Sequence, residues 1–110
     1  MNKIILHGNV TNNPEISVIK KGGTRKQSVQ DGTLVANFSL AVNRNSEEAD
    51  FFNCTAFNDK AELIEKYVVK GQELIIEGTC QNNFYEDKNG NMQYANRIIV
   101  NRIEFCGNKH

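Results

Sequence analysis

The chain has 110 residues, of which 13 are basic and 13 acidic, so its formal net charge is zero. This length suits a single domain with one modest hydrophobic core. A hydrophobic content of 39% and a charged content of 24% are typical of a globular protein and not of a disordered one. The longest apolar runs, residues 4–6 and 98–100, are too short for a membrane-spanning helix or a secretory signal, so we expect a cytoplasmic protein with no membrane association. The balanced charge excludes a general polycation but allows a local basic patch.

Three cysteines, Cys54, Cys80 and Cys106, are odd in number and lack C-x-x-C spacing. This pattern is typical of buried thiols in a cytoplasmic protein, and it predicts neither a disulfide nor a metal site. His7 has no histidine, cysteine or carboxylate at ligand spacing along the chain, so we expect a structural role for it. The sequence has no Ser/His/Asp, Cys/His or phosphate-loop constellation. We therefore expect neither a cofactor nor enzymatic activity.

The first elements expected are a strand over residues 4–10 and a turn at 12–14, where Asn-Asn-Pro interrupts the chain. Gly8 within the strand indicates a bend or a close approach of another backbone. Two short β-like stretches then flank a Gly-Gly pair, and they predict a protruding hairpin over about residues 16–31. The basic tip of this hairpin consists of Lys20, Lys21, Arg25 and Lys26.

Residues 33–44 and 49–57 alternate between two kinds of side chain, which is typical of strands with one buried face. A short acidic connection at 45–49 joins them. The outward face of the second strand is polar in the middle and has an aromatic ring at each end. Its outward residues are Phe51, Asn53, Thr55 and Phe57, and the inward residues of the two strands are Ala36, Phe38, Leu40, Val42, Phe52, Cys54 and Ala56.

The strongest helical pattern covers residues 59–71, DKAELIEKYVVKG. Asp59 is positioned to cap its N-terminus, with Glu62 three residues later in an arrangement like a capping box. Gly71 is a typical stop signal after the last turn. The apolar stripe expected to face the core consists of Ala61, Ile64 and Val68, with Leu63 and Tyr67 beside it.

The last hairpin is indicated by two long β-like stretches, residues 73–87 and 92–105, joined by Lys-Asn-Gly-Asn. Asn-Gly is a strong signal for a hairpin turn. We expect Phe84 and Tyr94 to pair across the two strands, because hairpin aromatics commonly do. Phe105 is expected in the core.

In chain order these elements are three strands, one helix and two strands, which is the layout of a five-stranded OB-fold barrel. We therefore expect an all-β fold and one OB-fold domain over residues 1–110, with the helix closing one end of the barrel. Residues 16–31 would be an inserted hairpin or loop, and residues 107–110 a flexible end. OB-folds hold oligonucleotides or oligosaccharides on the face of their second and third strands.

Four stretches of the sequence carry a resemblance to a known family. They are NKIILHGNVTNNPE, GTLVANFSLAVNR, EEADFFNCTAFNDKAELIEKYVVKGQELIIEG and YEDKNGNMQYANRIIVNRIEF. In this order and spacing the chain resembles the bacterial single-stranded DNA-binding proteins, although the segment over about residues 16–30 is longer than usual. The resemblance implies an OB-fold, sequence-tolerant binding of single-stranded DNA in replication, repair or recombination, and a homotetramer whose first strands pair across subunits. A dimer stays open as an alternative.

The resemblance also implies which residues contact DNA. Phe51 falls where the family commonly has a tryptophan that stacks on a base, and Phe57 and Tyr85 fall on two further stacking positions. Every base offers a π-face, and stacking contributes roughly 1–3 kcal/mol per base whatever the sequence. The alternative for Phe51 and Phe57 is that a ring folds under a loop or lies in a subunit contact. The predicted nucleic-acid-binding residues are Phe51, Phe57, Tyr85, Asn53, Thr55, Lys3, Lys70, Lys20, Lys21, Arg25 and Lys26.

The sequence departs from the family pattern in three respects. The first is a thinner basic strip, because Asp59, Gln81, Asn83 and Phe84 occupy positions where relatives often carry Lys or Arg. The basic tip of the inserted hairpin is expected to restore some of that charge, the alternative being a solvated loop tip.

The second departure is the absence of tryptophan, which predicts weaker stacking per subunit. The third is the ending FCGNKH, where the family has an acidic tail that recruits replication and repair proteins. We expect either a tailless member, such as one from a phage or mobile element, or a shortened form of a longer chain.

Two other hypotheses for the function remain open from the sequence. One is a dimer similar to primosomal replication protein N, a relative of similar length that also lacks the tail. The other is an OB-fold module for protein–protein contacts or oligosaccharides, with Phe51 and Phe57 as an interface patch or sugar platform. Sugar sites usually place carboxylates beside the ring, whereas the outward face here offers Asn53 and Thr55.

Overall fold

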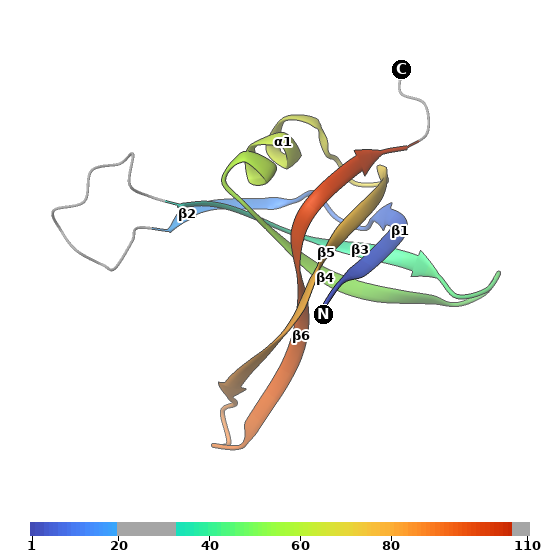
Figure 1. Ribbon diagram of the computed structural model, residues 1–110. Coiled ribbons are helices and arrows are strands. Elements are labelled where there is room, and N and C mark those ends of the chain that lie inside the picture. The colour runs from blue at the N-terminus through green and yellow to red at the C-terminus, as the bar shows by residue number, and fades with distance from the viewer. Residues whose placement is uncertain (20–32, 107–110) are drawn as a thin grey trace, which may run out of the picture.

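A computed structural model describes residues 1–19 and 33–106, without the side chains of Asn83, Tyr85 and Tyr94. The predicted basic tip (Lys20, Lys21, Arg25 and Lys26), the second arm of its hairpin and the chain end at 107–110 lie outside the described residues. Figure 1 shows the arrangement of the elements. In chain order they are β1 (Ile4–Val10), β2 (Glu15–Ile19), β3 (Thr33–Asn43), β4 (Ala49–Phe57), α1 (Asp59–Tyr67), β5 (Glu73–Glu86) and β6 (Met92–Phe105).

The strands form one sheet in the order β1-β5-β6-β4-β3-β2, and an additional pairing between β1 and β3 closes it into a barrel. The β4–β6 pair is parallel and the other pairs are antiparallel. Without β2, this is the closed five-stranded OB-fold with its helix between the third and fourth barrel strands, so the predicted fold is confirmed. The extra strand β2 pairs with β3 from Glu15 opposite Asn37 to Ile19 opposite Thr33, and it lies at the edge of the sheet.

Two glycines allow backbones to pass closely where the barrel bends. A Cβ atom on Gly8 would lie 2.2 Å from the carbonyl oxygen of Ala41, at the junction where β1 pairs with β3. A Cβ atom on Gly78 would lie 2.3 Å from the carbonyl oxygen of Ile99, beside a bulge between Glu77 and Gly78 in β5. Both positions therefore need glycine, and the close approach expected at Gly8 is confirmed.

The core lies inside the barrel and under α1. Helix α1 sits over one end of the barrel (Figure 1), and its predicted stripe of Ala61, Ile64 and Val68 is buried in the core. The other buried side chains of the core come from all five barrel strands, as alternation predicts for closed strands. They include Leu6, Val10, Ala36, Phe38, Leu40, Cys54, Ala56, Leu74, Ile76, Ile98 and Val100, with Val42 and Phe52 half-buried against them.

The predicted N-cap and the predicted C-terminal end of the helix are wrong. Asn58, at φ 53°, occupies the N-cap position, and no side chain caps the helix. The Asn58 side-chain oxygen instead accepts a hydrogen bond from the Leu34 N–H at 3.3 Å, so Asp59 is a helical residue and not a cap. At the other end the helix stops at Tyr67, because Val68 is already extended while its N–H still donates to the Ile64 carbonyl.

Phe105 was expected in the core, and this prediction is wrong. The side chain is 43% exposed at the last position of β6, on the rim of the barrel. Its ring packs edge-to-face against Tyr67, with the ring centroids 6.3 Å apart. Tyr67 is the last residue of α1 and is itself 61% exposed, so this aromatic pair lies at the surface and not in the core.

Strands β5 and β6 continue beyond the barrel as a long two-stranded arm (Figure 1). Phe84 and Tyr94 are directly opposite each other in its register, as predicted. The turn is held by Asp87, whose carboxylate accepts hydrogen bonds from the N–H groups of Asn89 and Asn91, each at 2.9 Å. These bonds hold the pKa of Asp87 below its usual value.

No helix among the described residues is long and apolar enough to cross a membrane.

Candidate nucleic-acid interface

The outward face of β3 and β4 forms a ladder of four rungs, which can be read directly from the strand register. Val35 lies opposite Phe57, Asn37 opposite Thr55, Ser39 opposite Asn53 and Ala41 opposite Phe51. The two middle rungs are polar, and each outer rung pairs an aromatic ring with a small or branched apolar residue. The two rings are six positions apart, so they lie about 20 Å apart along the strand.

Phe51 is the most accessible ring of this ladder. Its side chain is 67% exposed. It borders a groove of about 320 Å³ whose other lining residues include Phe52, Asn53 and Asn96. Phe57, at the far end, is half-buried and lies opposite Val35, which is itself 4% exposed. Phe51 can therefore offer a full ring face to a ligand, whereas Phe57 can offer only part of one.

A second groove of about 370 Å³ runs over the polar rungs and shares Asn53, Ala95 and Asn96 with the first. Its lining is dominated by amides and hydroxyls from β3, β4 and β6, with Glu15 from β2. The parallel pairing of β4 with β6 brings Arg97 to this groove, since its neighbour Ile98 lies opposite Cys54. The polar lining residues are Asn12, Glu15, Asn37, Ser39, Asn53, Thr55, Asn96 and Arg97.

Arg97 is the only cation that lines either groove among the described residues. Its Nε atom is buried without a hydrogen-bond partner, and its side chain forms no ion pair within the described part of the chain. A guanidinium presents several N–H donors in a planar fork suited to phosphate oxygens. Arg97 thus supplies an unused positive charge in the middle of the polar surface.

Thr55 has a supporting position in this surface. Its side chain is 3% exposed, and its hydroxyl donates a hydrogen bond of 2.8 Å to the side-chain oxygen of Asn37. Asn37 is exposed and makes no other side-chain hydrogen bond within the described residues, so its amide protons remain available to a ligand. A direct contact by Thr55 stays a prediction, and the structure offers Asn37 at the same rung for that contact.

The predicted basic residues that the structure describes lie outside the grooves. Lys3 forms an ion pair with Glu77 at 3.2 Å. Lys70 is exposed in the connection between α1 and β5, where its backbone N–H donates to the Asn13 side chain at 2.9 Å. Neither lysine lines a groove. The side chain of Tyr85 lies outside the described residues, so its contact with a ligand stays a prediction.

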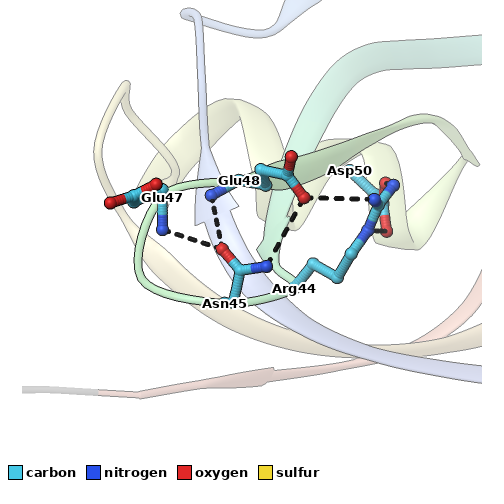
Figure 2. A network of polar contacts seen from close by, with 5 residues as sticks. All are labelled: Arg44, Asn45, Glu47, Glu48 and Asp50. Atoms are coloured by element: carbon cyan, nitrogen blue, oxygen red, sulfur yellow. Dashed lines mark hydrogen bonds and ion pairs between the residues drawn. The ribbon is translucent and has the colours of Figure 1, made fainter.

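Arg44, in the connection between β3 and β4, is close to Phe51 in sequence but its charge is already used (Figure 2). Its guanidinium contacts Asp50 at 2.5 Å and Glu48 at 3.3 Å. The Arg44 guanidinium holds the pKa of Asp50 below its usual value through a hydrogen bond and charge attraction. Asn45 closes the turn by accepting hydrogen bonds from the backbone N–H groups of Glu47 and Glu48. This network neutralises Arg44 and leaves Arg97 as the cation that the described part of the chain contributes to the grooves.

Comparison with known proteins identifies the family. A family model described as the single-strand binding protein family matches residues 1–106. The chain belongs to the single-strand binding protein family. This membership agrees with the barrel topology and with the position of Phe51 on the open face of β4.

Three relatives show how far the similarity extends. A protein named single-stranded DNA-binding protein from Clostridium perfringens (strain 13 / Type A) is 36% identical over 107 residues, which cover 96% of this chain and 65% of that protein. The single-stranded DNA-binding protein 1 of Staphylococcus aureus (strain Mu50) is 34% identical, covering 100% of this chain and 68% of that protein. A protein of the same name from Clostridium acetobutylicum (strain ATCC 824) is 34% identical, covering 99% and 96%. The chain thus spans about two-thirds of the first two relatives and nearly all of the third.

Sequence reasoning did not assign a role to Arg97 or Asn96. Arg97 alternates with Ile98 and Val100, which are buried, and this pattern marks Arg97 as outward-facing. What could have found them is the OB-fold topology itself, because it places the last strand parallel to the third and therefore beside the outward face of that strand.

Proposed function

We propose that this protein binds single-stranded DNA without sequence preference along the two connected grooves over β3, β4 and the adjoining part of β6. The observation that carries the proposal is the exposed ring of Phe51 at one end of a polar ladder, together with Arg97 in the adjoining groove, which forms no ion pair with any described residue. Membership of the single-strand binding protein family supports it. The protein would act without catalysis in the cytoplasm, in DNA replication, repair or recombination.

The chemistry of the surface suits a ligand whose sequence varies. A ring such as Phe51 stacks on any base, because every base has a π-face. The neighbouring amides of Asn37, Asn53 and Asn96 both donate and accept hydrogen bonds, so they can contact sugars, phosphates or base edges without demanding one pattern. Phe57, Tyr85 and Thr55, predicted to contact DNA, would extend or support this surface.

Charge would contribute through few contacts. Arg97 lies in the groove, while Glu15 at its edge opposes phosphate binding there. Each phosphate that is neutralised on a single strand adds about 0.7 to the slope of log affinity against log salt concentration. Lys70 would add a contact away from the grooves, Lys3 would do so only by exchanging its Glu77 partner for a phosphate, and the basic tip is predicted to add further contacts. The basic tip consists of Lys20, Lys21, Arg25 and Lys26, outside the described residues.

The test is a fluorescence anisotropy titration with labelled oligothymidine, labelled oligocytidine, a labelled duplex and a labelled RNA, at two salt concentrations. The proposal predicts comparable binding of the two single-stranded DNA oligonucleotides, weakened by salt, and much weaker binding of the duplex. Failure to bind either single strand at low salt would contradict it, and so would equal affinity for the duplex.

We also propose that the protein is a homo-oligomer, with a tetramer favoured over a dimer. The family resemblance implies pairing of first strands between subunits. Ile5 on β1 is 62% exposed, which suits an apolar residue that a second subunit would cover. Multi-angle light scattering distinguishes a tetramer from a dimer, and a monomer at micromolar concentration would contradict the proposal.

A further inference from the structure

Three side chains from distant parts of the sequence meet on the outward side of β1, β5 and β6. They are His7, Glu73 and Cys106. One imidazole nitrogen, one carboxylate oxygen and the thiol sulfur all lie within 4.8 Å of one another. The sequence predicted no metal site because no potential ligands are close along the chain, and the fold supplies the proximity that spacing does not.

The sheet register explains why these side chains lie close together on one side of the sheet. His7 lies opposite Ile75 and Asn9 lies opposite Glu73, so His7 and Glu73 are diagonal neighbours with side chains on the same side of the sheet. The Cys106 N–H donates to the Glu73 carbonyl at 3.1 Å, which sets the thiol beside the carboxylate. The Gln72 amide donates to the Glu73 carbonyl at 3.1 Å and to the Cys106 carbonyl at 3.4 Å, so it holds the two backbones together.

The donor set has the chemistry of a zinc site. Zn²⁺ is bound in proteins by imidazole nitrogen, thiolate sulfur and carboxylate oxygen, often with three protein ligands and a water. A thiolate disfavours Mg²⁺ and Ca²⁺, which prefer oxygen ligands only. Tetrahedral bonds of about 2.0–2.3 Å place ligand atoms about 3.3–3.8 Å apart, within the spread of this cluster.

Only small side-chain movements are needed to complete such a geometry. His7 Nε2 and Glu73 Oε2 are hydrogen-bonded at 2.5 Å, and they would separate by about 1 Å to admit an ion between them. The two side chains are 57% and 41% exposed, so space for this movement exists on the solvent side.

We propose that His7, Glu73 and Cys106 bind one Zn²⁺ ion per chain, with a water in the fourth position. Binding displaces the thiol proton of Cys106 and any proton on the coordinating nitrogen of His7, and both go to solvent. The ion joins the start of β5 to β1 and to the end of β6. None of the three ligands lines the grooves over β3 and β4, so the site is independent of the proposed DNA surface.

The experiment uses Co²⁺ as a spectroscopic substitute for Zn²⁺ on the complete chain. The wild-type protein should bind one Co²⁺ per chain with a thiolate-to-cobalt charge-transfer absorption, which Zn²⁺ abolishes by displacement and excess Mg²⁺ does not. Cys106→Ser should lose the charge-transfer absorption. His7→Gln should weaken Co²⁺ affinity by more than about tenfold, because even residues that only support a ligand contribute that much. Cys80→Ser, which removes another half-buried thiol, is the matched control and should behave like wild type.

Circular dichroism in the presence of a chelator shows whether each metal-free variant is folded. If His7→Gln is not folded, Glu73→Gln is measured in its place. The proposal is overturned if the wild-type protein shows no charge-transfer absorption. It is equally overturned if Cys106→Ser and Cys80→Ser change Co²⁺ binding to the same extent, because the thiol would then not be a specific ligand.

Discussion

Two faces of the barrel carry similar kinds of residue but use them differently. The groove face is the outward side of β3 and β4 with residues 95–97, and the paired face is the outward side of β1, β5 and β6. Each has a well-exposed apolar side chain, Phe51 at 67% and Ile5 at 62%. On the paired face the charges satisfy one another, as in Lys3–Glu77 and Arg102–Glu104, each at 3.2 Å. On the groove face Arg97 has no such partner within residues 1–19 and 33–106.

The difference shows how a chain with zero net charge can still contain a site for a polyanion. Exposed ion pairs contribute little to stability, about 0–1 kcal/mol each, but they remove a cation from competition for phosphate. A guanidinium without an ion-pair partner, next to amide groups and an exposed aromatic ring, remains able to bind a phosphate. The composition therefore says less about function than the pairing of each charge does.

The largest effect on stability is expected for a substitution at the junction of β1 and β3, because both faces of the barrel depend on this junction. Gly8→Ala places a Cβ atom against the Ala41 carbonyl oxygen, where β1 closes the barrel on β3. We expect the free energy of unfolding to fall by about 1–3 kcal/mol or more, because the oxygen belongs to backbone that cannot rotate away. Urea unfolding measures this as a lower midpoint, with Ser17→Ala on the exposed edge strand as the control. An unchanged midpoint would show that β1 and β3 are not closely paired.

The next effect separates the two faces directly. Arg97→Gln removes the unpaired charge of the groove face, and Arg102→Gln removes a paired charge of the other. A hydrogen bond to a charged group contributes about 1.5–3 kcal/mol, so Arg97→Gln should weaken oligothymidine binding at least tenfold, or by about 1.4 kcal/mol. It should also lower the salt slope by about 0.7, which corresponds to one phosphate.

Arg102→Gln should change the affinity less than about twofold, since its charge is already satisfied by Glu104. Anisotropy titrations at several salt concentrations compare the two variants. Equal losses from both would remove the distinction between the faces.

The smallest effect uses the three cysteines as reporters. Burial raises the pKa of the Cys54 thiol to about 12, so at pH values near neutrality this thiol is protonated as well as shielded. Thiolate is the reactive form, so iodoacetamide should leave Cys54 unmodified in the folded protein and modify it after unfolding. The raised pKa also means that any stability Cys54 contributes is present below its unfolded pKa and decreases as pH rises from there toward 12.

Oligothymidine should slow the modification of Cys80, which lines the groove beside Phe51, by several-fold. The rate at Cys106 should not change, because this thiol lies on the paired face. Peptide mass spectrometry measures each rate. Protection of Cys106 instead of Cys80 would place the DNA on the wrong face for the proposed interface.

The barrel could be predicted from the sequence because its signals are local and agree with one another. Alternation in β3 and β4, the apolar stripe of α1 and the Asn-Gly turn each specified one element, and their order left one familiar topology. The helix ends could not be predicted in this way. The Asn58 side chain binds Leu34, so a partner from another strand decided how the helix begins.

The candidate site was predictable in part for a related reason. Phe51 follows from alternation on one strand and from the family resemblance. Arg97 requires knowing that β6 lies parallel to β4, and the use of Arg44 requires knowing that Glu48 and Asp50 contact it. His7, Glu73 and Cys106 likewise come together only through the register of three strands. Contacts between distant segments were thus the information that the sequence pattern lacked.

Stacking of a base on Phe51 can be tested directly with a single tryptophan at this position. The chain contains no tryptophan, so Phe51→Trp places one fluorophore at the groove, and Phe105→Trp places one on the barrel rim as the control. We predict that oligothymidine strongly quenches the fluorescence of the Phe51→Trp protein, because the indole stacks on a base, and leaves the Phe105→Trp signal unchanged. Saturated oligothymidine binding without quenching at position 51 would show that no base stacks on this residue.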